Sequence, residues 1–508
     1  MFKKIASNTI SQIGSKAGTA IISIFLISIL TNYLTVELYG LYSKVYNYIG
    51  IFVFLADLGL YAITIREITN SREDTAKIVG NVMSLRLILG IIILFVATGI
   101  AYFLPGYNSS LAIYSIVIAS IFTIFQLLNS SILALMQANM KIEFSAVSLI
   151  LSKLLNLGLV GIIAYTFYPK SLIENSEYFT PFLYIVSAGV IGVIFNTILN
   201  YWYARKIVKF GFDFDWEYIK HLFKISLPYG LALFLSVVYF KVDVIILSLM
   251  EGPVKGDLSI ALYSLPMKIV EVLMVIGGFY MTSLLPSLTQ SFKKINSKNI
   301  SEEELDKNKN ELDFLIGTSF KVLFSFSVLV FTLGVLFRDY LIEIIANRNY
   351  IDTIHDFNSS DAFLVVFAVI VFNFLSLVFI YSLVASENQS RLLKINIVVT
   401  IFNIVGNIIL IPKYSFMGAG FTTLISQIIL TYLGYYYTRK LIKFHLPFMF
   451  IVKNLFIGVV IFGLGYFLLN NYRVGLYFDF VVYGGLLFGI YGGVLFWEFK
   501  SEHKKSLN

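Results

Sequence analysis

Fourteen long apolar stretches constrain this chain more than any other feature of its sequence. Each is about 20 residues or longer, the length that an α-helix needs to cross the hydrocarbon layer of a bilayer. Only helices and closed barrels satisfy the backbone in lipid, and barrel strands would show short alternating segments instead. The sequence therefore predicts an all-α polytopic membrane protein, with transmembrane helices at about 10–31, 39–65, 78–104, 111–137, 145–168, 180–203, 222–249, 258–290, 314–337, 361–385, 392–411, 417–438, 448–469 and 477–498.

The composition agrees with this class and excludes several functions. Only 13% of the residues are charged, whereas soluble proteins carry about 25%. The chain has no Cys, which excludes disulfides and cysteine nucleophiles, and its four His are scattered. There is no GxxxxGK[ST] motif and no long polar domain. We therefore expect a protein that is not an enzyme and that needs no metal or cofactor.

The positions of Lys and Arg predict the orientation in the membrane. The N-terminus, the loops after every even-numbered span and the C-terminus carry about four times as many Lys and Arg as the opposite loops. Cytoplasmic loops carry this excess in membrane proteins. We therefore expect a multi-pass protein of the cytoplasmic membrane with both termini inside. The net charge of +8 is assigned to these loops and not to nucleic-acid binding. The first span is expected to be retained, because no small-x-small cleavage site follows it.

An internal repeat predicts two lobes. YARKIVKF at 203–210 closes the sixth span, and YTRKLIKF at 437–444 closes the twelfth. GLYS and ALYS open spans two and eight in the same phase. A shift of six spans preserves orientation, so the halves form a parallel repeat, as in many transporters. We expect six-helix lobes at 1–210 and 211–444, with two further helices and a cytoplasmic tail at 445–508.

Ionisable residues inside the spans are the candidate functional residues, because a charge at mid-bilayer costs about 2.5–3.5 kcal/mol and needs a cavity or a partner. Most of them are basic and gather in spans one, two, seven and eight, which the repeat relates to one another. A basic cavity between two half-bundles suits an anionic ligand. The candidate substrate-binding residues are Lys16, Lys44, Lys241, Lys268, Arg86 and Lys153, and the candidate coupling or pairing acids are Asp57, Asp243 and Glu271.

Structural alternatives stay open for these residues. Arg86, Lys153 and Lys321 lie near the cytoplasmic ends of their spans, where their side chains can snorkel to water. Lys268 and Glu271 are three apart on one helix and can satisfy each other. Lys241 and Asp243 are two apart, so each needs another partner.

A glycine stripe in the last span, Gly485, Gly489 and Gly493, permits close helix contact. We expect it to serve internal packing rather than dimerisation, and we expect the protein to act as a monomer.

Three segments resemble a known family. DLGLYAITIRE at 57–67 is similar to the second-span signature of polysaccharide exporters. The stretch from SLPYGLALFL at 226 to LLPSLTQSF at 292 resembles the start of their second half, and ILIPKYSFMGAGFTTLISQIIL at 409–430 resembles their spans eleven and twelve. The chain is identified as a member of the oligosaccharide-lipid flippases (Wzx-type O-antigen and polysaccharide flippases) of the multidrug/oligosaccharidyl-lipid/polysaccharide exporter superfamily.

The resemblance implies two lobes in a V around a central cationic cavity, alternating access, and a polyprenyl-diphosphate-linked oligosaccharide as cargo. In the related lipid II flippases, basic residues of spans one, two and eight bind the diphosphate, and spans thirteen and fourteen hold the lipid tail. Lys16, Lys44 and Lys268 occupy those spans here, where that branch favours Arg, a better bidentate phosphate ligand. The partners implied are the lipid-linked cargo, membrane lipids, and polysaccharide polymerase or glycosyltransferase enzymes.

Two other functions remain alternatives. A multidrug cation exporter of the same superfamily would need acidic residues in its cavity. A membrane polysaccharide polymerase or glycosyltransferase would need a large external loop, and the longest here, about 338–360, is short but polar.

Overall fold

The structure is a computed structural model that describes residues 2–175, 177–295, 301–353, 356–442, 444 and 446–507. Within these residues the chain is helical, with turns between helices and no strand. Twelve helical segments of the described chain are long and apolar enough to cross a membrane. One of them, α14 (Gln389–Arg439), covers two expected spans, and the expected span at 222–249 lies in α9 (Trp216–Glu251). All fourteen expected ranges therefore lie on helices, and the all-α polytopic fold is confirmed.

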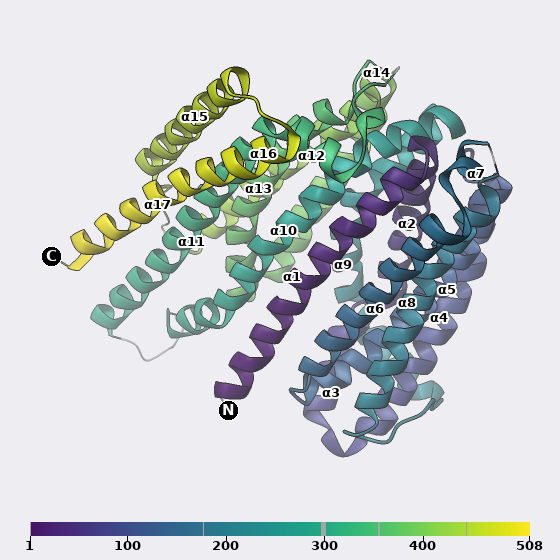
Figure 1. Ribbon diagram of the computed structural model, residues 1–508. Helices are drawn as coiled ribbons and strands as arrows, with labels where there is room; N and C mark the ends of the chain where they lie inside the picture. Colours follow the sequence, from purple (N-terminus) through teal and green to yellow (C-terminus); the bar gives the residue numbers. More distant parts are fainter. Residues whose placement is uncertain are drawn as a thin grey trace. The chain divides into compact units, whose positions relative to one another are not determined.

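The chain forms two compact units. Unit 1 comprises Met1–Ser264 and Ile404–Phe416. Its helices before α9 are α1 (Phe2–Tyr33), α2 (Val36–Asp57), α3 (Leu60–Asn70), α4 (Thr75–Phe103), α5 (Ser110–Ala138), α6 (Glu143–Ile162), α7 (Lys170–Glu174) and α8 (Phe179–Ala204), with short helical turns at Arg72–Asp74 and Ile163–Phe167. Within this unit α1 packs along α6, and α5 packs along α4 and α8 (Figure 1).

Unit 2 comprises Leu265–Asn403 and Met417–Asn508. It holds most of α10 (Pro253–Ile295), together with α11 (Glu302–Leu336), α12 (Arg338–Ile345), α13 (Ser359–Ala385), α15 (Phe448–Asn471), α16 (Leu476–Phe478) and α17 (Gly484–Leu507), with short turns at Arg348–Tyr350 and Asp479–Tyr483. Within this unit α11 packs on α13, α15 and α17, and α15 lies beside α17 (Figure 1). The lobes at 1–210 and 211–444 stay a prediction, because compactness does not test a repeat, and Lys443 lies outside the described residues.

Side-chain caps mark where several helices begin. The Thr35 and Ser109 hydroxyls accept hydrogen bonds from the backbone N–H groups of Leu38 and Ala112, at 3.3 Å each. Ser301 and Asn358 form capping boxes with acids three residues later. Such caps satisfy N–H groups that have no partner within the helix.

Two breaks interrupt the helices, one inside the second expected span and one between the eleventh and twelfth expected spans. The second span divides at Leu58 and Gly59, whose φ values of 46° and 71° are left-handed. Gly230 of α9 fits against this break, because a Cβ there would lie 2.3 Å from the Leu58 backbone. The long helix α14 breaks at Ser415, with φ 53° and ψ −139°.

The glycine stripe of the last span does not pack inside the protein. A Cβ placed on Gly485, Gly489 or Gly493 would meet no neighbouring atom within 4 Å. The expectation of internal packing is therefore wrong for these three positions, because α17 turns another face toward α11 and α15. Tyr491 lies on that face and donates hydrogen bonds to Ser325 O and Asn454 Oδ1, at 3.2 Å each.

Candidate functional site

Arg86 and Asp57 form an ion pair inside unit 1. Arg86 projects from α4 and is completely buried. Its Nη2 lies 2.5 Å from Asp57 Oδ1, and its Nη1 donates to Ser131 Oγ on α5 at 2.8 Å. Snorkelling to water is therefore wrong for Arg86. The pair ties α4 and α5 to the end of α2, because Asp57 is the last residue of that helix.

Lys44 is the most enclosed of the predicted lysines. Its side chain is fully buried, and its Nζ lies 2.5 Å from Asp257 Oδ1 on α10. The same ammonium donates to Gly106 O at 2.6 Å and lies 5.2 Å from the ring centroid of Tyr107. A carboxylate, a carbonyl and an aromatic face thus surround one ammonium group, which satisfies its charge within the protein.

Lys241 and Asp243 of α9 have separate partners, as their spacing predicts. Lys241 Nζ donates to Asn47 Oδ1 of α2 at 3.1 Å. Asp243 is buried, and its Oδ2 accepts a hydrogen bond from the Tyr263 hydroxyl at 2.7 Å. The expectation that each needs its own partner is confirmed.

Lys268 and Glu271 of α10 form an ion pair with each other, as their spacing predicts. Lys268 Nζ lies 2.7 Å from Glu271 Oε2, and the two side chains stay 34% and 42% exposed. This pair differs from the Arg86 and Lys44 pairs because both of its members remain open to solvent or ligand.

Lys16 and Lys153 belong to α1 and α6 of unit 1. The Lys16 side chain is exposed, although it stands within a segment long enough to span the membrane. Lys153 is half-buried. Among the predicted residues, Arg86 pairs with Asp57 and Lys268 pairs with Glu271. Lys44 instead forms its ion pair with Asp257, which is not one of the predicted residues.

Sequence reasoning missed several polar partners. Asp257 lies one residue before the expected eighth span at 258–290, so it was not counted as a membrane charge. Lys453 of α15 and Glu498 of α17 form a further pair, with Nζ 2.8 Å from Oε1. Lys453 lies inside the expected span at 448–469, and its charge in an apolar run was the available signal. Asn47 carried no such signal, because it has no charge, although amide side chains can hydrogen-bond between membrane helices.

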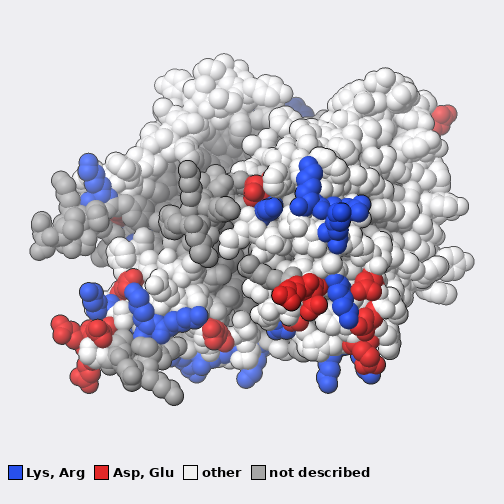
Figure 2. Space-filling model, turned by 90° about the horizontal axis from the view of Figure 1, so that it is seen from below, with Lys and Arg blue, Asp and Glu red and all other residues white. Residues whose placement is uncertain are grey.

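Charged side chains also gather at the ends of the helices, and the face drawn in Figure 2 carries neighbouring basic and acidic groups. One such contact in unit 1 joins Lys77 Nζ to Asp215 Oδ2 at 2.8 Å. The hydrogen bond from Lys77, followed by one from the backbone N–H of Tyr218, lowers the pKa of the Asp215 carboxyl. These bonds fix the start of α9 beside α4.

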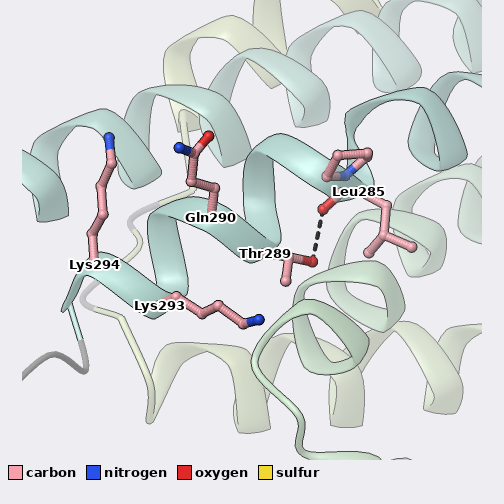
Figure 3. Close-up of a pocket in the computed structure, with 6 residues that line it drawn as sticks. Leu285, Thr289, Gln290, Lys293 and Lys294 are labelled. Atoms are coloured by element: carbon pink, nitrogen blue, oxygen red, sulfur yellow. Dashed lines mark hydrogen bonds between the residues drawn. The ribbon is translucent and has the colours of Figure 1, made fainter. Parts of the chain in front are cut away.

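The last turns of α10 line a pocket of about 650 Å³. Figure 3 shows that its side chains do not converge on one point, since Lys293 and Lys294 point in different directions. The Thr289 hydroxyl donates to Leu285 O at 2.8 Å, and Lys294 Nζ lies 3.6 Å from Glu311 Oε2. Two of the polar groups are thus engaged within the protein, and the pocket is not an enclosed binding site.

The described residues contain no group of three or more His, Cys, Asp or Glu placed to hold a metal ion. The charged groups of the membrane helices can therefore bind, pair or exchange protons, but they are not arranged as a metal centre.

Known proteins resemble the chain in sequence and in fold. The family model described as polysaccharide biosynthesis protein matches residues 5–292. The capsular polysaccharide biosynthesis protein CapF of Staphylococcus aureus is 23% identical over 381 residues, which cover 73% of this chain and 84% of that protein.

Two solved structures show the same fold at low identity. The lipid II flippase MurJ, in an inward closed conformation, aligns with a TM-score of 0.69 and 16% identity, covering 97% of this chain and 99% of its own. An inward-facing multidrug resistance MATE transporter of the MOP superfamily aligns with a TM-score of 0.60 and 12% identity, covering 85% and 98%. The fold is thus that of polytopic transporters.

Proposed function

The chain belongs to the polysaccharide biosynthesis protein family, and from this premise we propose that it is a flippase for a polyprenyl-diphosphate-linked oligosaccharide. The cargo would move from the cytoplasmic to the outer leaflet by alternating access, for the synthesis of a cell-surface polysaccharide. The relationship to a capsular polysaccharide biosynthesis protein and the shared fold with a lipid II flippase support this cargo class. The protein would act as a monomer, with both termini in the cytoplasm and with polymerase or glycosyltransferase partners.

The observation that carries the proposal is the presence of accessible basic side chains on membrane helices. Lys16 is exposed and Lys268 is 34% exposed. A charged side chain that faced lipid at this depth would be costly, so both positions favour a polar cavity. A diphosphate offers several oxygens that accept charge-assisted hydrogen bonds from ammonium groups. We propose that Lys16, Lys268, Lys241 and Lys153 contact the head group. Binding by Lys44 or Arg86 would first require the loss of an ion pair.

The membrane potential favours the proposed direction of transport. When the cytoplasm is negative, each negative charge that moves outward gains about 2.3 kcal/mol per 100 mV. A diphosphate head group that travels without bound cations would use this gain directly. Asp57, Asp243 and Glu271 would pair with bases or couple ions in this scheme.

The alternative of a multidrug cation exporter keeps the support of the shared MATE fold. Such a transporter needs acids that are open to a cation. Here Asp57, Asp243, Asp257 and Glu271 each contact a base or a tyrosine hydroxyl of the protein. The pairing of these acids favours an anionic cargo. A polymerase or glycosyltransferase remains the less supported alternative.

The test is export in cells whose own copy of the gene is deleted. Lys16→Ala and Lys268→Ala should each reduce surface polysaccharide at least tenfold and leave lipid-linked precursor inside, because each removes a diphosphate contact. Arg at either position should restore part of the export, and Glu should be worse than Ala because it repels the diphosphate. Surface polysaccharide and precursor would be measured together with the amount of protein in the membrane.

Two controls separate cargo binding from pairing. Glu271→Gln frees Lys268 without removing it, so export should persist, whereas a purely structural pair would make Glu271→Gln as harmful as Lys268→Ala. Lys255→Ala changes an exposed lysine (59%) outside the proposed site and should leave export unchanged. Full export by the Lys16→Ala, Lys268→Ala double variant would refute the assignment of these lysines.

A further inference from the structure

We propose that the ion pair between Lys44 and Asp257 is a releasable latch, which holds the first turns of α10 against α2 and opens when α10 bends. The latch belongs to unit 1, which contains both residues. By the predicted topology it lies at the external ends of the two helices.

The contact around the latch is a direct meeting of two backbones. A Cβ on Gly40, one turn before Lys44, would lie 1.7 Å from Asp257 O and 3.2 Å from Ala261 N. No larger side chain fits at residue 40 without separating the helices. The charges of Lys44 and Asp257 therefore meet where α2 and α10 already touch.

Neighbouring hydrogen bonds define which part of α10 the latch holds. Ser259 Oγ donates to Glu251 Oε2 at 2.5 Å and lies 3.1 Å from Ser415 Oγ. All three residues belong to unit 1. The first turns of α10 are thus tied to the end of α9, to the break in α14 and, through Asp257, to α2.

The helix has a weak point directly after the latched turns. Unit 1 ends at Ser264 on α10 and unit 2 begins at Leu265, although the helix is continuous. Pro266 follows inside the helix. Proline has no N–H to donate to the carbonyl four residues earlier, and its ring favours a kink at that turn. A bend at Pro266 would let the first turns of α10 move away from α2 while the rest of the helix keeps its packing within unit 2.

An ion pair suits a contact that must open repeatedly. A buried pair is held firmly while closed, because an uncompensated buried charge is costly. When the external end opens to water, hydration of both ions offsets the lost attraction. Two apolar side chains would gain nothing from the water, so they would favour the closed state throughout the cycle.

Labelling of a single cysteine tests the latch. The chain has no Cys, so Ser264→Cys creates the only thiol. Ser264 is 3% exposed and follows Asp257 by seven residues, which places both on one face of α10. Purified protein in lipid vesicles would be treated with a membrane-impermeant maleimide. In this background the double variant Lys44→Gln, Asp257→Asn should label at least fivefold faster than the protein with the intact pair.

Replacing Lys44 or Asp257 alone would leave the other charge buried without a partner, which could cause misfolding. The double variant removes both charges and avoids this problem. Asp257→Glu keeps the pair and should label within twofold of the parent. Lys255→Gln, which removes an exposed neighbouring lysine, is the matched control and should not change the rate. Equal labelling of the double variant and this control would overturn the latch. The experiment contains no cargo, so its result does not depend on the proposed substrate, which only the export test addresses.

Discussion

Arg86 is completely buried, and its counter-charge comes from the last residue of another helix. The carboxylate of Asp57 lies at the C-terminal end of α2, where a positive charge also interacts favourably with the helix dipole. Asp57 keeps 24% of its side chain exposed, whereas Arg86 has none. The two partners are therefore unequal, because the Arg86 charge is fully buried and needs the carboxylate of Asp57.

This inequality predicts the effect of removing the acid. Asp57→Asn should lower the free energy of unfolding by about 3–5 kcal/mol, because it leaves the Arg86 charge buried without a carboxylate. The double variant Asp57→Leu, Arg86→Met should recover most of that loss. Denaturation in mixed micelles would measure both. Arg66→Gln, which removes an arginine that is 55% exposed from a surface pair, should change the free energy by less than about 1 kcal/mol. A smaller loss for Asp57→Asn than for Arg66→Gln would contradict this view of the pair.

Local spacing predicted some of these contacts and could not predict others. Lys268 and Glu271 share a helix face by their separation, so their pairing was foreseeable from the sequence. Lys44 and Asp257 meet only because α2 and α10 pack together, and the spacing of residues along a chain says nothing of that contact. Asp257 also lay outside the expected span by one residue, because apolar runs locate helix ends only approximately.

The break between α2 and α3 shows the same limit at the scale of elements, whereas the break in α14 does not. Hydropathy predicted the helices well, since about 20 apolar residues are needed whatever the packing. It could not place the bend between α2 and α3, because apolar residues continue across Leu58 and Gly59. At α14, Lys413 and Tyr414 interrupt two apolar runs. The sequence therefore predicted a connection there, and the structure places the break at Ser415.

The backbone of Ser415 predicts an order of stability among its variants. Its φ of 53° with ψ −139° suits glycine and strains other residues, at about 1–3 kcal/mol. Ser415→Ala keeps this strain and loses the hydrogen bond to Ser259, so it should lower the free energy of unfolding by about 1 kcal/mol. Ser415→Gly loses the same bond but relieves the strain, and it should be more stable than Ser415→Ala by about 1–3 kcal/mol.

Unfolding in mixed micelles would compare the two Ser415 variants with the parent protein. The matched control is Ser386, a serine at the end of α13 whose φ of −88° is negative and therefore unstrained. Ser386→Gly should show no such advantage over Ser386→Ala. If alanine were at least as stable as glycine at 415, the strain would be absent.

For the whole molecule, the distribution of Lys and Arg predicts the sides of the membrane on which the loops lie. Reporter fusions at Asn108 and Asn358 should be active outside the cell, and fusions at Lys209 and Lys443 should be active in the cytoplasm, because positive loops remain inside. Paired alkaline phosphatase and fluorescent protein reporters would measure each position. A cytoplasmic signal at Asn108 together with an external signal at Lys209 would reverse the orientation of the protein and place the latch on the inner side.

The division of the chain also has a consequence for its biosynthesis. Unit 1 is interrupted by 265–403 and completed only by Ile404–Phe416. A ribosome that adds about 5–20 residues per second takes on the order of ten seconds to make the intervening part. During that interval Ser259 has no hydrogen bond to Ser415, because Ser415 has not yet been synthesised. The nascent first unit is therefore incomplete while most of the second is inserted, and a chain truncated before residue 404 should be a good substrate for membrane quality-control proteases.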